Sequence, residues 1–241
     1  MKYIYHNFGL GDHIVCNGLV RYIKEIEGII SIFCKPNNYN NVKYMFRDDE
    51  NIKIISIGDD QLTQNYILEN KLQDDLIFIN LCYELKDTYS KNTTFKDVSY
   101  FKFGKNLDCE TFDKMFYNIL KIPFKVRFDN FFLKRDYSLE NDICQTLNPN
   151  NEKYIFVHNV DKDKIRNDLK IIENPDEYSI FDLITLIENA EEVHLMESSI
   201  KNLVNSIKMD KPKFFYHKYV RKEYTHSFFN AKGLNKFETI L

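Results

Sequence analysis

The sequence predicts an α/β protein made of two tandem Rossmann-like domains that face a cleft, in a compact version. Short apolar runs such as IISIFC, IKIIS and YIFVH alternate with segments whose apolar residues recur at helical spacing. Continuous apolar strands separated by helices are typical of a parallel sheet that is covered on both faces. A polar stretch at roughly 137–152 carries Asn and Pro turn residues and is the expected linker. We therefore predict domains at 1–136 and 150–241.

The first half is expected to alternate between strands and helices. Residues 2–7 (KYIYHN) have the composition of a strand, and residues 17–26 place Leu19, Val20 and Ile23 at helical spacing. Continuous apolar runs predict strands at 29–36, 52–58 and 75–81, and the segments between them predict helices at 42–46 and 61–70. Residues 87–104 are irregular and polar, and an amphipathic helix is expected at 111–122.

The second half repeats this alternation. Strands are expected at 154–159 (YIFVHN), at 191–198 (EEVHLMES) and, as the last strand, at 213–220 (KFFYHKYV). Helices are expected at 179–190, with Ser179 or Asp182 as the cap, and at 198–208. Two runs of strands and helices in one chain are the basis for the prediction of two domains.

The composition describes an ordinary globular protein. Of 241 residues, 44% are hydrophobic and 29% are charged, and the formal charge is −3, so no basic surface for nucleic acid or anionic membranes is expected. The five cysteines are scattered, without metal-ligand spacing, which fits reduced thiols in the cytoplasm. The sequence shows neither the apolar core of a signal peptide nor an apolar run near the ~20 residues of a membrane span.

A glycine-rich turn with an acid, GLGD, follows the first predicted strand. Glycines allow a tight turn and the close approach of a ligand to a helix start, where backbone N–H groups favour anions. The turn is not a dinucleotide-binding GxGxxG motif, because Ile14 occupies the position of the third glycine, and it lacks the GK[ST] of a Walker loop. Asp12 is a candidate functional carboxylate, and a simple helix cap is the alternative.

A second group of polar residues lies in the other half of the chain. His158 and Asn159 end one predicted strand, and Glu197, Ser198 and Ser199 end the next strand and begin a helix. The carboxyl ends of parallel strands share one edge of a sheet, where ligands bind. Arg166, after the first of these strands, is a candidate phosphate ligand. The alternatives are a helix cap at Ser198 and Ser199, a core histidine at His158 and a solvated charge at Arg166.

The segment GLGDHIVCNGLVRYI resembles the first loop of GT-B glycosyltransferases, especially the heptosyltransferase-like group. This resemblance implies a GT-B-like fold, with Asp12 as the general base for an acceptor hydroxyl and with Gly11, His13 and Asn17 on the acceptor side. A carboxylate in a partly dehydrated cleft has a raised pKa and accepts a proton more readily.

The segment IENAEEVHLMESSIKNLV is similar to the nucleotide-sugar donor segment of the same enzymes. By this resemblance Glu197, Ser198 and Ser199 bind the donor. His158, Asn159 and Arg166, which follow the neighbouring predicted strand, are the further candidate donor ligands. Ile200 and Lys201 stand where heptosyltransferases have a glycine and a histidine, which leaves the identity of the donor open. A formal DxD motif also occurs at 161–163, but no metal is required in the domain that it resembles, so no metal site is expected.

The predicted function is that of a metal-independent glycosyltransferase. It would move a sugar from a nucleotide-diphosphate donor to a glycan or another hydroxyl acceptor, without a cofactor, while Arg166 and backbone amides stabilise the departing diphosphate. A sugar-nucleotide epimerase would share the scaffold, and a non-catalytic nucleotide-sugar-binding module is also open. A nicotinamide-dependent dehydrogenase is disfavoured by Ile14.

Overall fold

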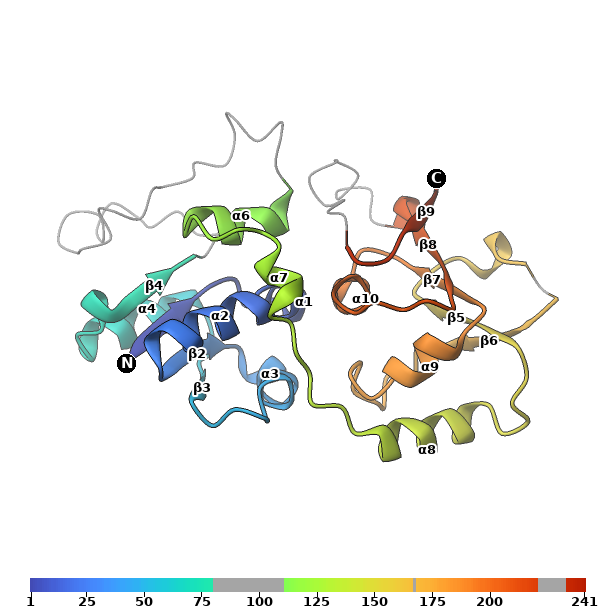
Figure 1. Ribbon diagram of the computed structural model, residues 1–241, viewed down its shortest axis with the longest axis horizontal. Coiled ribbons are helices and arrows are strands. Elements are labelled where there is room, and N and C mark those ends of the chain that lie inside the picture. Colours follow the sequence, from blue (N-terminus) through green and yellow to red (C-terminus); the bar gives the residue numbers. More distant parts are fainter. Residues whose placement is uncertain (80–110, 167, 221–232) are drawn as a thin grey trace. The chain divides into compact units, whose positions relative to one another are not determined.

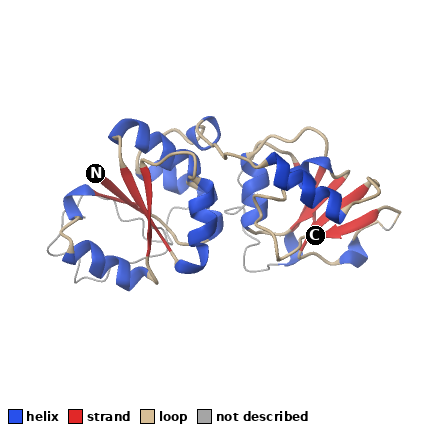
Figure 2. Ribbon diagram, turned by 90° about the horizontal axis from the view of Figure 1, so that it is seen from below, coloured by secondary structure: helices blue, strands red, loops and turns tan. Residues whose placement is uncertain are grey.

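The computed structural model describes residues 1–79, 111–166, 168–220 and 233–241. The chain divides into two compact units, residues 1–134 and 135–241. Each unit holds one sheet whose neighbouring strands are all parallel (Figure 1). Helices flank both sets of strands (Figure 2). The predicted α/β class with two parallel sheets is confirmed.

The first unit contains a four-stranded sheet in the order β3-β2-β1-β4. Its strands are β1 (Lys2–Tyr5), β2 (Ile30–Cys34), β3 (Ile52–Ser56) and β4 (Leu76–Phe78). Its helices are α1 (Leu10–Val15), α2 (Asn17–Glu27), α3 (Tyr39–Met45), α4 (Asp60–Glu69), α6 (Phe112–Ile119) and α7 (Val126–Asp129). The strands and helices predicted for this half are confirmed, except that the end of the 75–81 strand and the polar segment 87–104 lie outside the described residues.

Aromatic side chains from three strands build one side of this unit's core. Tyr5 of β1 lies 6.1 Å from Phe33 of β2 and 5.2 Å from Phe78 of β4, measured between ring centroids. Ile67 of α4 packs into the same cluster, so α4 covers this face of the sheet. The aromatic contacts hold β1 at the centre of the sheet and thereby position the segment that follows it.

The second unit contains a five-stranded sheet in the order β6-β5-β7-β8-β9. Its strands are β5 (Tyr154–His158), β6 (Lys170–Glu173), β7 (Glu192–Leu195), β8 (Lys213–His217) and β9 (Phe237–Ile240), and its helices are α8 (Tyr137–Leu147), α9 (Ile184–Asn189) and α10 (Ser199–Ser206). The sequence reading omitted β6 and β9. The expectation that the 213–220 strand is the last one is wrong, because β9 pairs with β8.

The predicted linker at 137–152 is wrong, because most of it forms α8. The Asp136 carboxylate caps this helix by accepting the backbone N–H of Leu139 at 3.1 Å. Glu140 is fully buried and accepts hydrogen bonds from Arg135 and from Thr185 of α9. These bonds attach α8 to the second unit, which therefore begins at Arg135 rather than at residue 150.

The predicted caps of the 179–190 helix are also wrong. Helix α9 begins only at Ile184, and Leu183 occupies its cap position without a side-chain hydrogen bond. Ser179 instead accepts the backbone N–H of Phe181 at 3.4 Å within the turn that precedes the helix. The apolar residues of this turn are buried, so burial rather than a side-chain cap determines where the helix starts.

By a general rule, the strand order indicates the edge of each sheet at which a ligand is expected to bind. In open α/β sheets, ligands bind beyond the carboxyl ends of the strands, at the point where the strand order reverses. That point lies between β1 and β4 in the first unit and between β5 and β7 in the second.

The described helices include none that is long and apolar enough to cross a membrane.

Candidate active site

The Asp12 carboxylate lies just beyond β1, beside the point where the strand order of the first unit reverses. Gly9 is the cap residue of α1, and Asp12, three residues later, accepts a hydrogen bond from the Gly9 backbone N–H. A Cβ atom at Gly9 would lie only 2.7 Å from Asp12 Oδ2. Glycine is required here so that the carboxylate can fold back over the turn, whereas the backbone angle φ of Gly9 is an ordinary −67°.

Burial changes the acidity of Asp12. The side chain is partly exposed, yet loss of solvation raises the pKa of its carboxyl to about 7, against a smaller opposing effect of the Gly9 hydrogen bond. A carboxyl group with a pKa near neutrality exchanges a proton readily at physiological pH, as a general base must. The predicted alternative, Asp12 as a simple helix cap, is wrong, because Gly9 is the cap residue of α1. Asp12 is the third helical residue, and its contact with the Gly9 N–H forms one half of a capping box.

Two buried histidines, His6 and His13, belong to the segment of the chain that carries this carboxylate. His13, predicted on the acceptor side, is fully buried, and its ring meets that of His6 edge-on at 4.4 Å. Burial lowers the pKa of His6 to about 4 and that of His13 well below its usual value, so both rings are neutral at pH 7. Neither ring therefore supplies a positive charge that would lower the pKa of Asp12.

Asn17 is occupied by a structural contact. Its amide group donates to the carbonyl oxygen of Phe132 at 3.3 Å, and its amide oxygen accepts the Phe132 N–H at 3.1 Å. Asn17 therefore joins the start of α2 to the segment that ends the first unit. The acceptor-side roles of Asn17, His13 and Gly11 remain predictions.

The second unit presents its polar residues at its own reversal point. His158 ends β5 and pairs in register with Leu195, the last residue of β7. Asn159 follows with a left-handed backbone angle φ of 52° and an exposed side chain. Glu197 and Ser198 come directly after β7, so the structure brings these residues to the same edge of the sheet, as predicted from the sequence.

Ser198 is the cap residue of α10, and its hydroxyl accepts the backbone N–H of Lys201 at 3.3 Å. The Glu197 carboxylate pairs with the Lys201 ammonium at 2.5 Å, and this ammonium lies 4.3 Å from the centre of the Tyr216 ring. Lys201 is only 4% exposed. Sequence reasoning missed Lys201 and Tyr216 as site residues, although the four-residue spacing of Glu197 and Lys201 signals a helical ion pair.

Arg166 does not join this group. Its guanidinium pairs with Glu192 and with Asp168, each at 3.3 Å. Glu192 is the first residue of β7, at the opposite end of that strand from Glu197. The predicted donor residues are thus brought together except for Arg166, whose side chain is directed toward the amino ends of the strands.

The DxD motif has a local structural use. The Asp161 carboxylate accepts the Asp163 backbone N–H at 3.1 Å and caps a short 3-10 turn. No group of three His, Cys, Asp or Glu side chains suited to a metal ion is found within the described residues. Cys16, Cys34 and Cys144 are free thiols, while Cys82 and Cys109 lie outside the described residues.

Comparisons with solved structures identify proteins of the same fold. The crystal structure of the glycosyl transferase family 9 protein from Veillonella parvula DSM 2008 matches with a TM-score of 0.60 at 9% identity, over 99% of this chain and 85% of that one. The structure of ADP-heptose LPS heptosyltransferase II from E. coli matches with a TM-score of 0.54 at 9% identity, over 100% of this chain and 90% of that one.

These matches extend over practically the whole chain and confirm the resemblance at the level of the fold. The chain shares the overall fold of these two glycosyltransferase structures, which is consistent with a GT-B-like arrangement. No protein-family model matches the sequence, and no curated protein matches it significantly. At 9% identity the likeness concerns the fold, and the roles of individual residues rest on their geometry.

Proposed function

We propose that this protein is a metal-independent glycosyltransferase that moves a sugar from a nucleotide-diphosphate donor to a hydroxyl of a glycan or a similar acceptor. The observation that carries this proposal is the position of Asp12, a carboxyl with a pKa near 7 at the strand-order reversal of the first unit. The fold shared with two glycosyltransferase structures supports the reaction class. The scattered free thiols favour a cytoplasmic setting.

In the proposed reaction the Asp12 carboxylate removes the proton of the acceptor hydroxyl. The hydroxyl oxygen then forms a bond to the anomeric carbon of the donor sugar, while the bond from that carbon to the diphosphate breaks. The electron pair of the broken bond leaves with the nucleoside diphosphate. A base with a pKa near 7 is largely ionised just above neutral pH and still basic enough to accept the proton.

The second unit would stabilise the negative charge of the leaving diphosphate. The Lys201 ammonium lies at the start of α10, where backbone N–H groups also favour an anion. Its partner Glu197 holds it in place at 2.5 Å. We assign this charge to Lys201 rather than to Arg166, because Arg166 pairs with Glu192 at the other end of β7. His158, Asn159 and the hydroxyl of Ser199 complete the proposed donor site.

A transfer assay tests the role of Asp12. Wild type and Asp12→Asn would be incubated with UDP-, ADP-, GDP- and CDP-sugars and a panel of glycan acceptors, and released nucleoside diphosphate would be measured with and without acceptor. Asp12→Asn is expected to bind donor with unchanged affinity and to lose transfer. Asp74→Asn is a matched control, because Asp74 is an exposed carboxylate just before β4, at the amino end of the sheet.

The outcomes separate the alternatives. Unchanged transfer by Asp12→Asn would remove the assignment of the base. An isomerised donor sugar formed without an acceptor would indicate an epimerase. Saturable donor binding with no turnover across the acceptor panel would indicate a non-catalytic nucleotide-sugar-binding module.

A further inference from the structure

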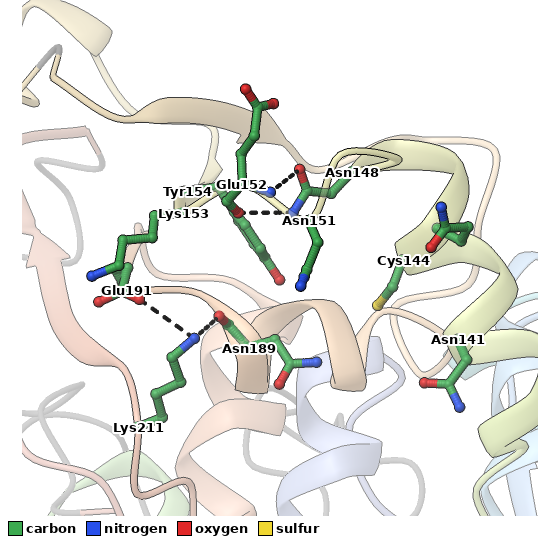
Figure 3. A pocket seen from close by; sticks show the side chains of 11 residues that line it. Asn141, Cys144, Asn148, Asn151, Glu152, Lys153, Tyr154, Asn189, Glu191 and Lys211 are labelled. Atoms are coloured by element: carbon green, nitrogen blue, oxygen red, sulfur yellow. Dashed lines mark hydrogen bonds and ion pairs between the residues drawn. The ribbon is translucent and has the colours of Figure 1, made fainter.

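A polar pocket of about 520 Å³ opens at the other edge of the second unit's sheet, where the strands begin (Figure 3). Lys153 precedes β5, Glu191 precedes β7 and Lys211 precedes β8, while residues of α8 and the end of α9 form the remaining wall. The volume lies within the range of roughly 300–1,000 Å³ that small-molecule sites occupy. This pocket is separate from the proposed donor site, which lies at the carboxyl ends of the same strands.

Internal hydrogen bonds hold the wall of the pocket in place. The Asn148 amide donates to the carbonyl oxygen of Glu152 at 2.9 Å, and its oxygen accepts the Glu152 N–H at 3.2 Å. On the opposite side, the Lys211 ammonium donates to the backbone oxygen of Asn189 and pairs with Glu191 at 3.5 Å. A wall that is already ordered loses little conformational entropy when a ligand binds.

Three carboxamides around this space are available to a ligand. Asn141, Asn151 and Asn189 are exposed, and within the described residues their side chains make no hydrogen bond to the protein. They come from α8, from the turn before β5 and from the end of α9, and Figure 3 shows them on different sides of the same space. Each carboxamide offers donors and an acceptor next to one another, which matches the paired donor and acceptor character of neighbouring hydroxyl groups.

Both acids that line the pocket are paired with lysines. Glu191 pairs with Lys211 at 3.5 Å and Glu152 pairs with Lys170 at 3.7 Å, while Lys153 is the other base of the lining. Burial raises the pKa of the Cys144 thiol in the wall to about 11, so this group is uncharged at neutral pH. Since both acids already neutralise a lysine, the carboxamides are the main groups left to a ligand, and they favour a neutral ligand rich in hydroxyls.

We propose that this pocket binds a neutral sugar ring through its hydroxyl groups, as a carbohydrate site apart from the site of transfer. This site is inferred from the pocket alone, independently of the proposed glycosyltransferase function.

The experiment is a nuclear magnetic resonance titration of the ¹⁵N-labelled full chain. D-glucose, D-galactose, D-mannose and N-acetylglucosamine are added in turn, with inorganic phosphate as a separate arm. At least one sugar is expected to shift the side-chain amide resonances of Asn141, Asn151 and Asn189 in a saturable manner. Asn141→Ala combined with Asn189→Ala should weaken that binding by about tenfold, since two hydrogen bonds are lost.

Asn65→Ala is the matched control, because it removes an exposed carboxamide from α4 of the first unit, and it should leave sugar binding unchanged. The proposal is overturned if none of the four sugars shifts the three asparagine resonances, if phosphate shifts them and the sugars do not, or if the double variant binds as tightly as wild type. Nucleotide-sugar transfer is measured separately in the same double variant, so a failure here is distinguishable from a failure of the proposed function.

Discussion

Replacing Asp12 with asparagine is expected to stabilise the protein above neutral pH. Burial raises the pKa of this carboxyl from 3.8 to about 7, so between these values the folded chain keeps a proton that the unfolded chain has released. The ionised carboxylate therefore destabilises the folded protein. This cost is absent below pH 3.8, the pKa in the unfolded chain, grows as the pH rises, and is complete above about pH 7, the pKa in the folded protein. At about 1.36 kcal/mol per unit, the full cost is roughly 4 kcal/mol.

The assay is unfolding by urea, followed by circular dichroism at about pH 5 and about pH 8. The free energy of unfolding of Asp12→Asn should exceed that of wild type by roughly 4 kcal/mol at the higher pH and by about 1–2 kcal/mol at the lower pH. The difference arises because asparagine has no proton to release. Asp74→Asn, at an exposed site, should show little effect at either pH. An equal effect of Asp12→Asn at the two pH values, or none at the higher one, would refute the raised pKa and with it the physical argument for this base.

Three further results are expected. Gly18→Ala should destabilise the protein by about 1–3 kcal/mol in urea unfolding, because a Cβ atom would lie 2.5 Å from a backbone oxygen of α7, and normal stability would refute this close contact. Glu140→Gln should cost about 1.5–3 kcal/mol, since a buried charged acceptor is lost, and Glu188→Gln, at a more exposed carboxylate, should cost less. Burial lowers the pKa of His6 and of His217 to about 4, so their neutral rings contribute stability that is present above pH 6.5 and lost as the pH falls toward 4. Their ring resonances should therefore stay constant down to about pH 5, and a midpoint near 6.5 would contradict their burial.

The carboxyl ends of the strands in both sheets could be predicted from the sequence, because apolar runs mark parallel strands. The ends of β1, β5 and β7 follow directly from those runs, and Asp12, His158 and Glu197 lie next to them. Only the strand order, which the sequence does not reveal, shows that these ends flank the reversal points. Arg166 follows β5 as expected, but its pairing with Glu192 depends on a distant residue and could not be predicted locally.

The helix within 137–152 could not be predicted locally, because the polar composition of this segment is also typical of a linker. A buried ionic contact stabilises the helix there. The fully buried Glu140 carboxylate pairs with Arg135 and accepts a hydrogen bond from Thr185, which is 45 residues away in the sequence. Composition alone does not distinguish a solvated glutamate from one with a buried partner. The same reasoning applies to Lys201, whose burial depends on Glu197 and on the ring of Tyr216.

We expect the edge formed by the carboxyl ends of β5 and β7 to bind a nucleoside diphosphate. The most direct test is calorimetric titration of the full chain with UDP, ADP, GDP and CDP, in wild type and in a Ser198→Ala, Ser199→Ala double variant. Asp136→Ala is the control, because it removes the cap of α8 in the same unit and leaves this edge intact. The account predicts saturable binding of at least one diphosphate that weakens in the double variant and persists in the control. No binding by wild type, or equal affinity in the double variant, would contradict it.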